Sequence, residues 1–324
     1  MKIFTNPNYD FLRWRWHALA LSAIVVAAGI AVLIARGGLP LGIDFSGGTI
    51  VVLRFESPVS EESVRNAVAS IPGEKVVQKY GAADANEILV RLPQMGTEQG
   101  FNLEEGARQV LSLVERANVG KFEVLSTEVV GPVIGADLQR KGILATVASI
   151  IGITIYIALR FRFSFAVGAI AATFHDIFVT IAFLTFFGYE LSLNVVAAIL
   201  TITGYSVNDT IVIFDRVREN FRTMRRDSLA HIVNTSVNQT LGRTIITAGT
   251  TFLAVLALYL YGGEVLEGFA FTMLVGIVSG TYSTVFIASA IAIIMSGRKA
   301  AARVDSVPTS DNARGKKPAR RAKA

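Results

Sequence analysis

Three ionisable residues stand out because the segments around them are otherwise apolar: Asp176, Asp209 and Arg243. A charged side chain inside a bilayer is costly, so it normally faces a cavity or a partner and serves a function. A carboxylate that alternates between a protonated and an ionised state can carry a proton, and a neighbouring cation favours its ionised state. The chemistry that these residue types allow is ion transfer within a membrane.

The spacing of Asp209 and Arg243 places them at similar depths. Asp209 lies six residues before the polar boundary at Asp215, which is a depth of about 9 Å at 1.5 Å per residue. Arg243 follows the start of the next apolar segment near Thr240, so it enters from the same side. We expect the two side chains to pair across neighbouring helices. The alternative for Arg243 is that its long side chain reaches to the membrane interface.

Hydroxyl side chains accompany these residues at helical spacing. Thr201 and Tyr205 precede Asp209 by eight and four residues, so all three share one helix face. Hydroxyl groups can hold water in a hydrogen-bonded file, which apolar side chains cannot do. The sequence therefore predicts a hydrated proton pathway that contains Asp209, Arg243 and Asp176. We expect it to be lined by Thr201, Tyr205, Thr247 and Thr251.

Asp176 also has a structural alternative, because its neighbour His175 could make a local hydrogen bond that packs helices together. A metal site at this pair is not expected, since adjacent side chains diverge on a helix and no third ligand is evident. No cofactor is expected either. The spacing of Gly276 and Gly280 is typical of closely packed membrane helices.

The elements that must position these residues are membrane spans. Of the 324 residues, 52% are hydrophobic and 17% are charged, and the mean hydropathy of +0.50 is outside the range of ordinary soluble domains. A hydrocarbon core about 30 Å thick requires roughly 20 apolar helical residues. Six segments qualify, at about 17–35, 143–159, 165–187, 191–214, 240–261 and 269–295.

Lys and Arg in the short loops predict the orientation of these spans. They occur in the N-terminal segment and after the second and fourth spans, and they are absent after the third and fifth. We therefore expect both termini in the cytoplasm. The expected division is a cytoplasmic N-terminus with the first span (1–35), an extracytoplasmic domain (36–141), a five-helix bundle (142–296) and a basic tail (297–324).

The tail carries nine Lys or Arg residues against two Asp from Arg298 onward, a balance of +7. This composition is typical of a disordered cytoplasmic end after a last membrane span. Attraction to anionic lipid or to the ribosome is a further possibility for it.

The extracytoplasmic segment shows the periodicity of a small α+β domain. Strands are predicted at 49–55, 76–80, 87–92 and 122–130, and helices at 60–71 and 102–117, with Ser60 as an N-cap. The order β-α-β-β-α-β is that of a ferredoxin-like fold. The fold class is thus an α-helical membrane protein with six transmembrane helices and a ferredoxin-like extracytoplasmic domain. With no Cys and only three His, the chain lacks a nucleophile with a base, and we expect no enzyme.

Five sequence strings in order carry a family resemblance. They are GIDFSGG (42–48), VGPVIGADL (130–138), AATFHD (171–176), NDTIVIFDRVREN (208–220) and LGRTIITAGTT (241–251). With the six spans, the chain from Trp14 to Ser296 resembles the SecF members of the SecD/SecF protein-export family, relatives of the resistance-nodulation-division transporters.

The resemblance implies a multi-pass subunit of the bacterial plasma membrane that pairs with SecD. Such subunits work with the SecYEG channel and use the proton-motive force to assist late translocation of unfolded polypeptide. The coupling ion, proton or sodium, stays open. The resemblance also implies that Asp209 and Arg243 take part in proton conduction. The alternative is a proton-driven exporter of small molecules or lipids on the same scaffold. Drug exporters of that superfamily have much larger outer regions than the segment 36–141 of this chain.

Overall fold

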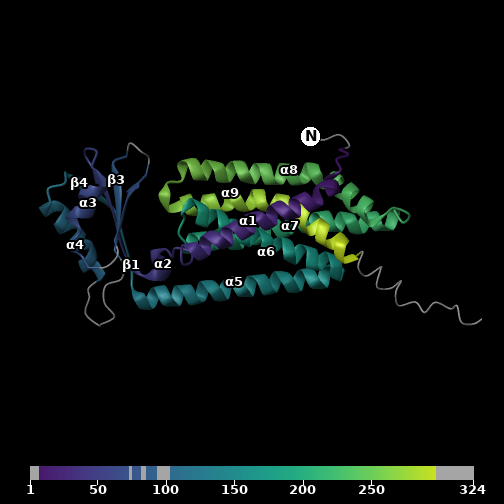
Figure 1. Cartoon of the computed structure of the whole chain (residues 1–324), viewed down its shortest axis with the longest axis horizontal. Coiled ribbons are helices and arrows are strands. Elements are labelled where there is room, and N and C mark those ends of the chain that lie inside the picture. Colours follow the sequence, from purple (N-terminus) through teal and green to yellow (C-terminus); the bar gives the residue numbers. More distant parts are fainter. Residues whose placement is uncertain (1–6, 73–74, 82–84, 93–102, 297–324) are drawn as a thin grey trace, which may run out of the picture.

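A computed structural model describes residues 7–72, 75–81, 85–92 and 103–296 of the chain. Figure 1 shows an α/β domain at one end of a bundle of long helices that run side by side. The basic tail expected at 297–324 lies outside the described residues.

Long helices form the bundle, and six of them are long and apolar enough to cross a membrane, as predicted. A short 3₁₀ helix, η1 (Phe11–Trp14), leads into α1, and a π-helical turn, η2 (Thr284–Ala288), follows α9. The six helices are α1 (Arg15–Ala35), α5 (Pro132–Arg160), α6 (Phe163–Phe187), α7 (Leu193–Thr223), α8 (Leu229–Tyr261) and α9 (Glu264–Ser283), the last continuing through η2 to Ser296.

Local sequence signals explain several helix ends. Ser192 and Ser228 are N-caps whose side chains accept hydrogen bonds from the backbone N–H groups of Val195 and His231. Gly188 ends α6 in the left-handed conformation, at a φ of 77°, which favours glycine. These caps place the boundaries of α6, α7 and α8 where the chain turns.

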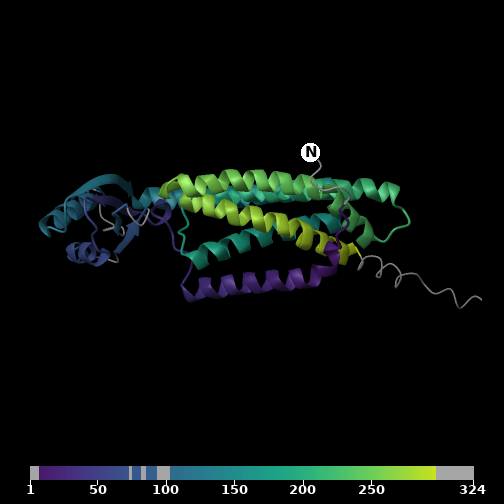
Figure 2. The ribbon, with the colours of Figure 1, turned by 90° about the horizontal axis from the view of Figure 1, so that it is seen from above.

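Helices α6, α7 and α9 form the interior of the bundle, and α1, α5 and α8 surround it. Around half of the residues in the apolar stretches of α6, α7 and α9 are buried, whereas few are buried in α1, α5 and α8. Figure 2 shows α1 as the outermost helix on one side of the bundle. The exposed faces of the outer helices are therefore available to lipid or to partner chains.

The α/β domain is a four-stranded antiparallel sheet with the strand order β2-β3-β1-β4. This strand order is that of a ferredoxin-like fold, which was expected from the β-α-β-β-α-β succession along the sequence, and the N-cap at Ser60 is confirmed as well. Its elements are α2 (Ile43–Ser46), β1 (Gly48–Phe55), α3 (Glu61–Ala67), β2 (Val76–Tyr80), β3 (Glu87–Leu92), α4 (Leu103–Arg116) and β4 (Phe122–Val130).

The core of this domain comes from alternate residues of β1, which point toward the two helices. Val51, Leu53 and Phe55 are buried with Val64 of α3 and Val110 of α4. The short helix α2 is absent from the sequence prediction, because four residues give no periodic signal. It packs against the start of α5 near Gly135, where an added Cβ would lie 3.2 Å from the backbone nitrogen of Gly47.

Glycines allow close contact between the interior helices. A Cβ added at Gly280 would lie 2.9 Å from Ser206 Cβ, and one added at Gly276 would overlap Ile202. Both contacts join α9 to α7, so the prediction of close helix packing at this glycine pair is confirmed.

Gly168 gives a direct test of this packing. A Cβ at this position would lie 2.5 Å from the carbonyl oxygen of Ala288, a backbone atom of η2 that cannot rotate away. We expect Gly168→Ala to lower the free energy of unfolding by about 1–3 kcal/mol, because overpacking forces the helices apart. Thermal unfolding of the purified protein in detergent measures this effect.

The matched control is Gly152→Ala on α5, where an added Cβ meets nothing within 4 Å. It should be neutral or slightly stabilising, because alanine favours a helix more than glycine does. Equal melting of the two variants would contradict the packing argument.

Candidate functional site

Asp209 lies on α7 and faces α8. Thr244 Oγ1 donates a hydrogen bond of 2.8 Å to Asp209 Oδ1. The other carboxylate oxygen, Oδ2, is buried and has no hydrogen-bond partner among the described residues. One oxygen of this carboxylate is therefore fixed, while the other is free to take a proton or to accept a further donor.

Arg243 immediately precedes Thr244 on α8 and is exposed. It attracts the Asp209 carboxylate electrostatically, yet the ion pairs found within residues 7–296 do not include this one. The sequence analysis expected the two side chains to pair. In this conformation Thr244 is the direct partner of Asp209, and Arg243 stands beside it on an open face.

The four residues expected to line a pathway lie near this face without forming a continuous chain of hydrogen bonds. Thr201 and Thr247 are exposed, whereas Tyr205 and Thr251 are partly buried. The hydroxyls of Thr201 and Thr251 donate to carbonyls one turn earlier on their own helices, at 2.8 and 2.9 Å. Each hydroxyl keeps its acceptor lone pairs, so water can still bind to them.

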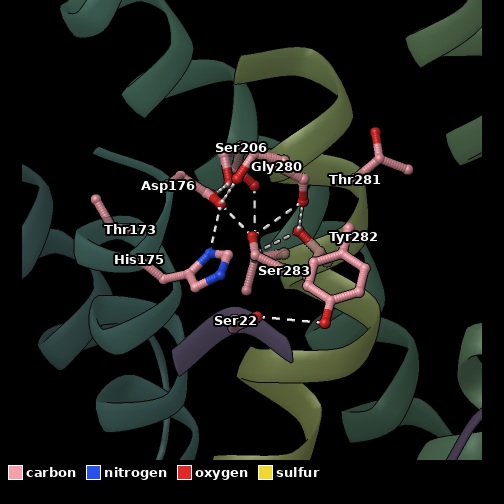
Figure 3. Close-up of polar contacts among 12 residues, drawn as sticks. Ser22, Thr173, His175, Asp176, Ser206, Gly280, Thr281, Tyr282 and Ser283 are labelled. Atoms are coloured by element: carbon pink, nitrogen blue, oxygen red, sulfur yellow. Dashed lines mark hydrogen bonds and ion pairs between the residues drawn. The ribbon is translucent and has the colours of Figure 1, made fainter. Parts of the chain in front are cut away.

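Asp176 is the most extensively hydrogen-bonded carboxylate inside the described bundle (Figure 3). It is 1% exposed. Ser206 and Ser283 donate to its Oδ2 at 2.6 and 2.7 Å, and Ser279 donates to its Oδ1 at 2.8 Å. His175 Nδ1 lies 3.1 Å from Oδ1. These five residues, which we call the Asp176 cluster, join α6, α7 and α9.

The cluster has features of the two roles open to a buried acid, which are helix packing and proton binding. The three serine hydroxyls satisfy the carboxylate, as a structural role requires. His175 Nε2, however, is buried and has no partner among the described residues. It lines an apolar cavity of about 460 Å³ between α1, α6, α8 and α9, together with Ser22 and Tyr282.

The three serines were not among the site residues expected from the sequence. Ser279 and Ser283 are four residues apart, which is one helix face, and Ser206 lies three residues before Asp209. Their spacing was visible, but serine is common in membrane helices and nothing in the sequence linked them to Asp176. The same turn of α7 thus contacts one acid through Ser206 and carries the other, Asp209.

Two polar contacts extend the cluster along α7. Thr210 Oγ1 lies 3.0 Å from Thr284 Oγ1 of η2, and it is also 3.2 Å from the carbonyl oxygen of Ser206. Thr284 follows Ser283 in the sequence and is the first residue of the π-helical turn η2. The two acids therefore lie within one connected set of helices.

The α/β domain is joined to the bundle at a junction formed by residues 40–46, the loop 188–192 and Arg91. The backbone N–H of Gly42 donates to the Leu191 carbonyl, and the Leu191 N–H donates to the Pro40 carbonyl, both at 2.8 Å. Arg91 of β3 pairs with Glu190 at 2.5 Å and donates to the Leu41 carbonyl at 2.7 Å.

Tyr189 in the same loop contacts the N-terminal part of α9. Its hydroxyl donates to Glu267 Oε1 at 2.6 Å, and its ring stacks on Phe271 at a centroid distance of 4.4 Å. Burial and the hydrogen bond to Glu267 raise the pKa of Tyr189 well above its ordinary value, so the hydroxyl remains a donor at all physiological pH values.

Among the described residues, no group of three or more His, Asp or Glu side chains is arranged to hold a metal ion. The groups available for chemistry are two separate carboxylates, the hydroxyls that contact them and the guanidinium of Arg243. Six apolar helices long enough to span a membrane, buried carboxylates between them and a small α/β domain define a multi-pass membrane protein with acidic side chains in its interior.

Comparison with known proteins gives the family. The family model described as "Protein export membrane protein SecD/SecF, C-terminal" matches residues 109–298, and the SecD/SecF GG motif matches residues 32–59. The chain belongs to the SecD/SecF family. This family consists of export components, which agrees with the expectation that the chain is not an enzyme.

Two curated relatives share most of their length with this chain. "Protein translocase subunit SecF" of Escherichia coli O157:H7 is 39% identical over 286 residues, which are 88% of this chain and 87% of the relative. The protein of the same name from Vibrio alginolyticus is 41% identical over 289 residues, which are 89% of this chain and 90% of the relative. The resemblance to SecF is thus confirmed.

A solved structure shows the same fold. The crystal structure of SecDF from Thermus thermophilus, described as a translocon-associated membrane protein, matches with a TM-score of 0.80 and 36% identity. The match covers 90% of this chain but only 39% of that SecDF chain. The chain is therefore similar to one part of a longer chain.

Proposed function

We propose that this chain is the SecF-type subunit of a protein-export machinery and that it couples ion flow across the plasma membrane to late stages of polypeptide export. In this proposal it acts with SecD and the SecYEG channel. Both termini face the cytoplasm, and the α/β domain lies on the outer side, where it contacts unfolded polypeptide. The coupling ion is the proton, with sodium as the competing ion.

The observation that carries the proposal is the setting of Asp209. One of its oxygens is held by Thr244, its other oxygen is buried with no hydrogen-bond partner in the part of the chain that the structure describes, and Arg243 stands beside it. A carboxylate in this setting can exist protonated, or ionised and attracted to the guanidinium. Movement of one charge through the membrane potential supplies roughly 2.3 kcal/mol per 100 mV, enough to shift a balanced pair of conformations.

The exposed face beside Asp209 supports a partner within the membrane. Arg243, Thr247 and Asn208 are exposed at the surface of α7 and α8, inside segments long enough to span a bilayer. Lipid tails offer these groups neither charge nor hydrogen bonds, so a polar partner surface suits them better. The longer SecDF chain of Thermus thermophilus, of which this chain covers 39%, suggests a SecD half as that partner.

The junction supports a path from the bundle to the outer domain. Helices α6 and α7, which carry Asp176 and Asp209, are connected by the loop that pairs with residues 40–42. A change in the relative positions of these helices therefore acts on the segment that leads into β1. In the proposal this motion lets the domain hold emerging polypeptide against backsliding.

Ion flux through the reconstituted complex tests the proposal. We expect Arg243→Gln to lower potential-driven proton flux at least about tenfold, because the ionised form of Asp209 loses roughly 1.4 kcal/mol of favourable charge interaction. Flux is measured in vesicles that contain the complex with SecD, once in proton-only and once in sodium-only buffer. Export of a secretory protein into the same vesicles is measured in parallel.

Arg140→Gln is the control, because Arg140 is also exposed but lies near the start of α5, away from Asp209. This variant should keep the flux and the export of the unchanged complex. If Arg243→Gln keeps both as well, the proposed role of Arg243 fails. Transport of a small amphiphile with no effect on polypeptide export would instead favour the exporter alternative.

A further inference from the structure

The turn between α5 and α6 lies at the end of the bundle opposite the α/β domain (Figure 1). A second cavity, which is polar, lies where this turn meets α7. Its volume is about 400 Å³, which is within the range of small-molecule sites. Its lining combines two kinds of side chain. They are four arginines, Arg160, Arg162, Arg218 and Arg222, and a set of phenylalanines.

The positive charge of this cavity is largely unneutralised. Arg160 pairs with Asp215 at 2.8 Å, and the other nearby carboxylate, Glu219, pairs with Arg216. Arg162, Arg218 and Arg222 are exposed, and none of the three forms an ion pair within the described ranges up to residue 296. Three guanidinium groups therefore surround one hollow without a matching anion.

Phenylalanine rings form the floor of the cavity. Phe165 and Phe214 are buried and meet edge to face at a centroid distance of 5.0 Å, and Phe161 and Phe221 pack against them. The guanidinium of Arg162 lies over the Phe221 ring at 6.0 Å, which holds it at the rim. A ligand that fits this site has an anionic group for the rim and apolar atoms for the floor.

The position of the cavity, at the ends of two membrane spans, indicates that its ligand is a lipid. Arg160 ends one span and Arg162 immediately precedes the next, so the cavity lies where the apolar segments stop and phospholipid phosphates are found. Leading away from it, α5 presents the exposed side chains of Ile155 and Leu159. These can accompany acyl chains while the arginines bind a phosphate, which guanidinium groups recognise through paired hydrogen bonds.

We propose that this arginine cavity binds the phosphate headgroup of an anionic glycerophospholipid. The site is separate from the Asp176 cluster and from Asp209, and it requires only that the chain be in a membrane. A bound lipid would fix the α5–α6 turn against α7 at the base of the bundle.

Native mass spectrometry of the delipidated protein in detergent tests the site, with phosphatidylglycerol and phosphatidylcholine as probes. We expect phosphatidylglycerol to bind preferentially, and Arg162→Gln with Arg218→Gln to weaken its binding about thirty-fold, because two surface cations are lost. Arg225→Gln with Arg226→Gln is the matched control, because these exposed arginines follow on the same segment but do not line the cavity. It should leave the binding unchanged.

Two further arms make the result decisive. Arg162→Lys with Arg218→Lys keeps the charge and should retain most of the binding, which separates charge loss from misfolding; thermal unfolding checks that all variants fold. Glycerol 3-phosphate should not displace the lipid, because it cannot use the phenylalanine floor. Displacement by glycerol 3-phosphate, equal binding of the two lipids, or equal weakening by the control variant would each overturn the proposal.

Discussion

Asp209→Asn should reduce potential-driven proton flux through the reconstituted complex to the level of empty vesicles and remove ion-dependent stimulation of export. Asparagine has nearly the same shape, and its side-chain oxygen can still accept the hydrogen bond that Thr244 donates at 2.8 Å to Asp209. It cannot bind and release a proton, however, nor carry the charge that Arg243 attracts. Flux is measured with a pH-sensitive dye under an imposed membrane potential.

The control for this variant is Asp215→Asn, six residues further along α7, where the carboxylate pairs with Arg160 at the end of α5. Asp215→Asn makes the same chemical change at a carboxylate that is partly exposed, and it should keep full flux. Co-purification with SecD should be unchanged for both variants, since neither alters the shape of the bundle. Full flux through the Asp209 variant would refute the proton-carrying role of this acid.

Asp176→Ala should have the largest effect on stability. It leaves the hydroxyls of Ser206, Ser279 and Ser283 without their common acceptor at a site that is 1% exposed. Unpaired buried donors and the void left by the carboxylate together should cost about 3–5 kcal/mol of unfolding free energy. Thermal and denaturant unfolding in detergent measure this loss.

Two comparisons show whether Asp176 acts through structure or through proton transfer. Asp137→Ala removes an exposed carboxylate that forms an ion pair with Lys141, and it should change the stability very little. Asp176→Asn keeps one acceptor oxygen and should lose less stability than Asp176→Ala. A variant with unchanged melting but no proton flux would instead place Asp176 in the conduction route.

The membrane spans and the β-α-β-β-α-β succession of the small domain could be predicted because each depends on local periodicity. The extent of α7 and α8 beyond the membrane spans could not be predicted. Helices α7 and α8 extend beyond the apolar stretches, and contacts between distant residues hold these extensions: Asn220 donates to Ser236 and Gln239. Asn234 and Asn238 likewise bind the backbone of Tyr9, more than 220 residues away in sequence. The hydropathy pattern does not show which distant residues will form such hydrogen bonds.

The candidate site could likewise be predicted only in part. Depth along neighbouring spans was enough to bring Asp209 and Arg243 to adjacent helices, because that argument needs only the rise per residue. Which hydroxyl would bind Asp209 depends on helix rotation, and the structure selects Thr244. The serines around Asp176 come from α7 and α9, 30 and more than 100 residues away, so only tertiary packing shows that they converge.

The junction between the domain and the bundle relies partly on main-chain atoms, in addition to the side-chain contacts of Arg91. The two hydrogen bonds between Gly42, Leu191 and Pro40 involve no side chain. Most substitutions at Leu191 would therefore leave this connection intact, whereas proline would delete the N–H that it requires. This part of the connection between the domain and the bundle can therefore tolerate many sequence changes, because it depends on no particular side chain.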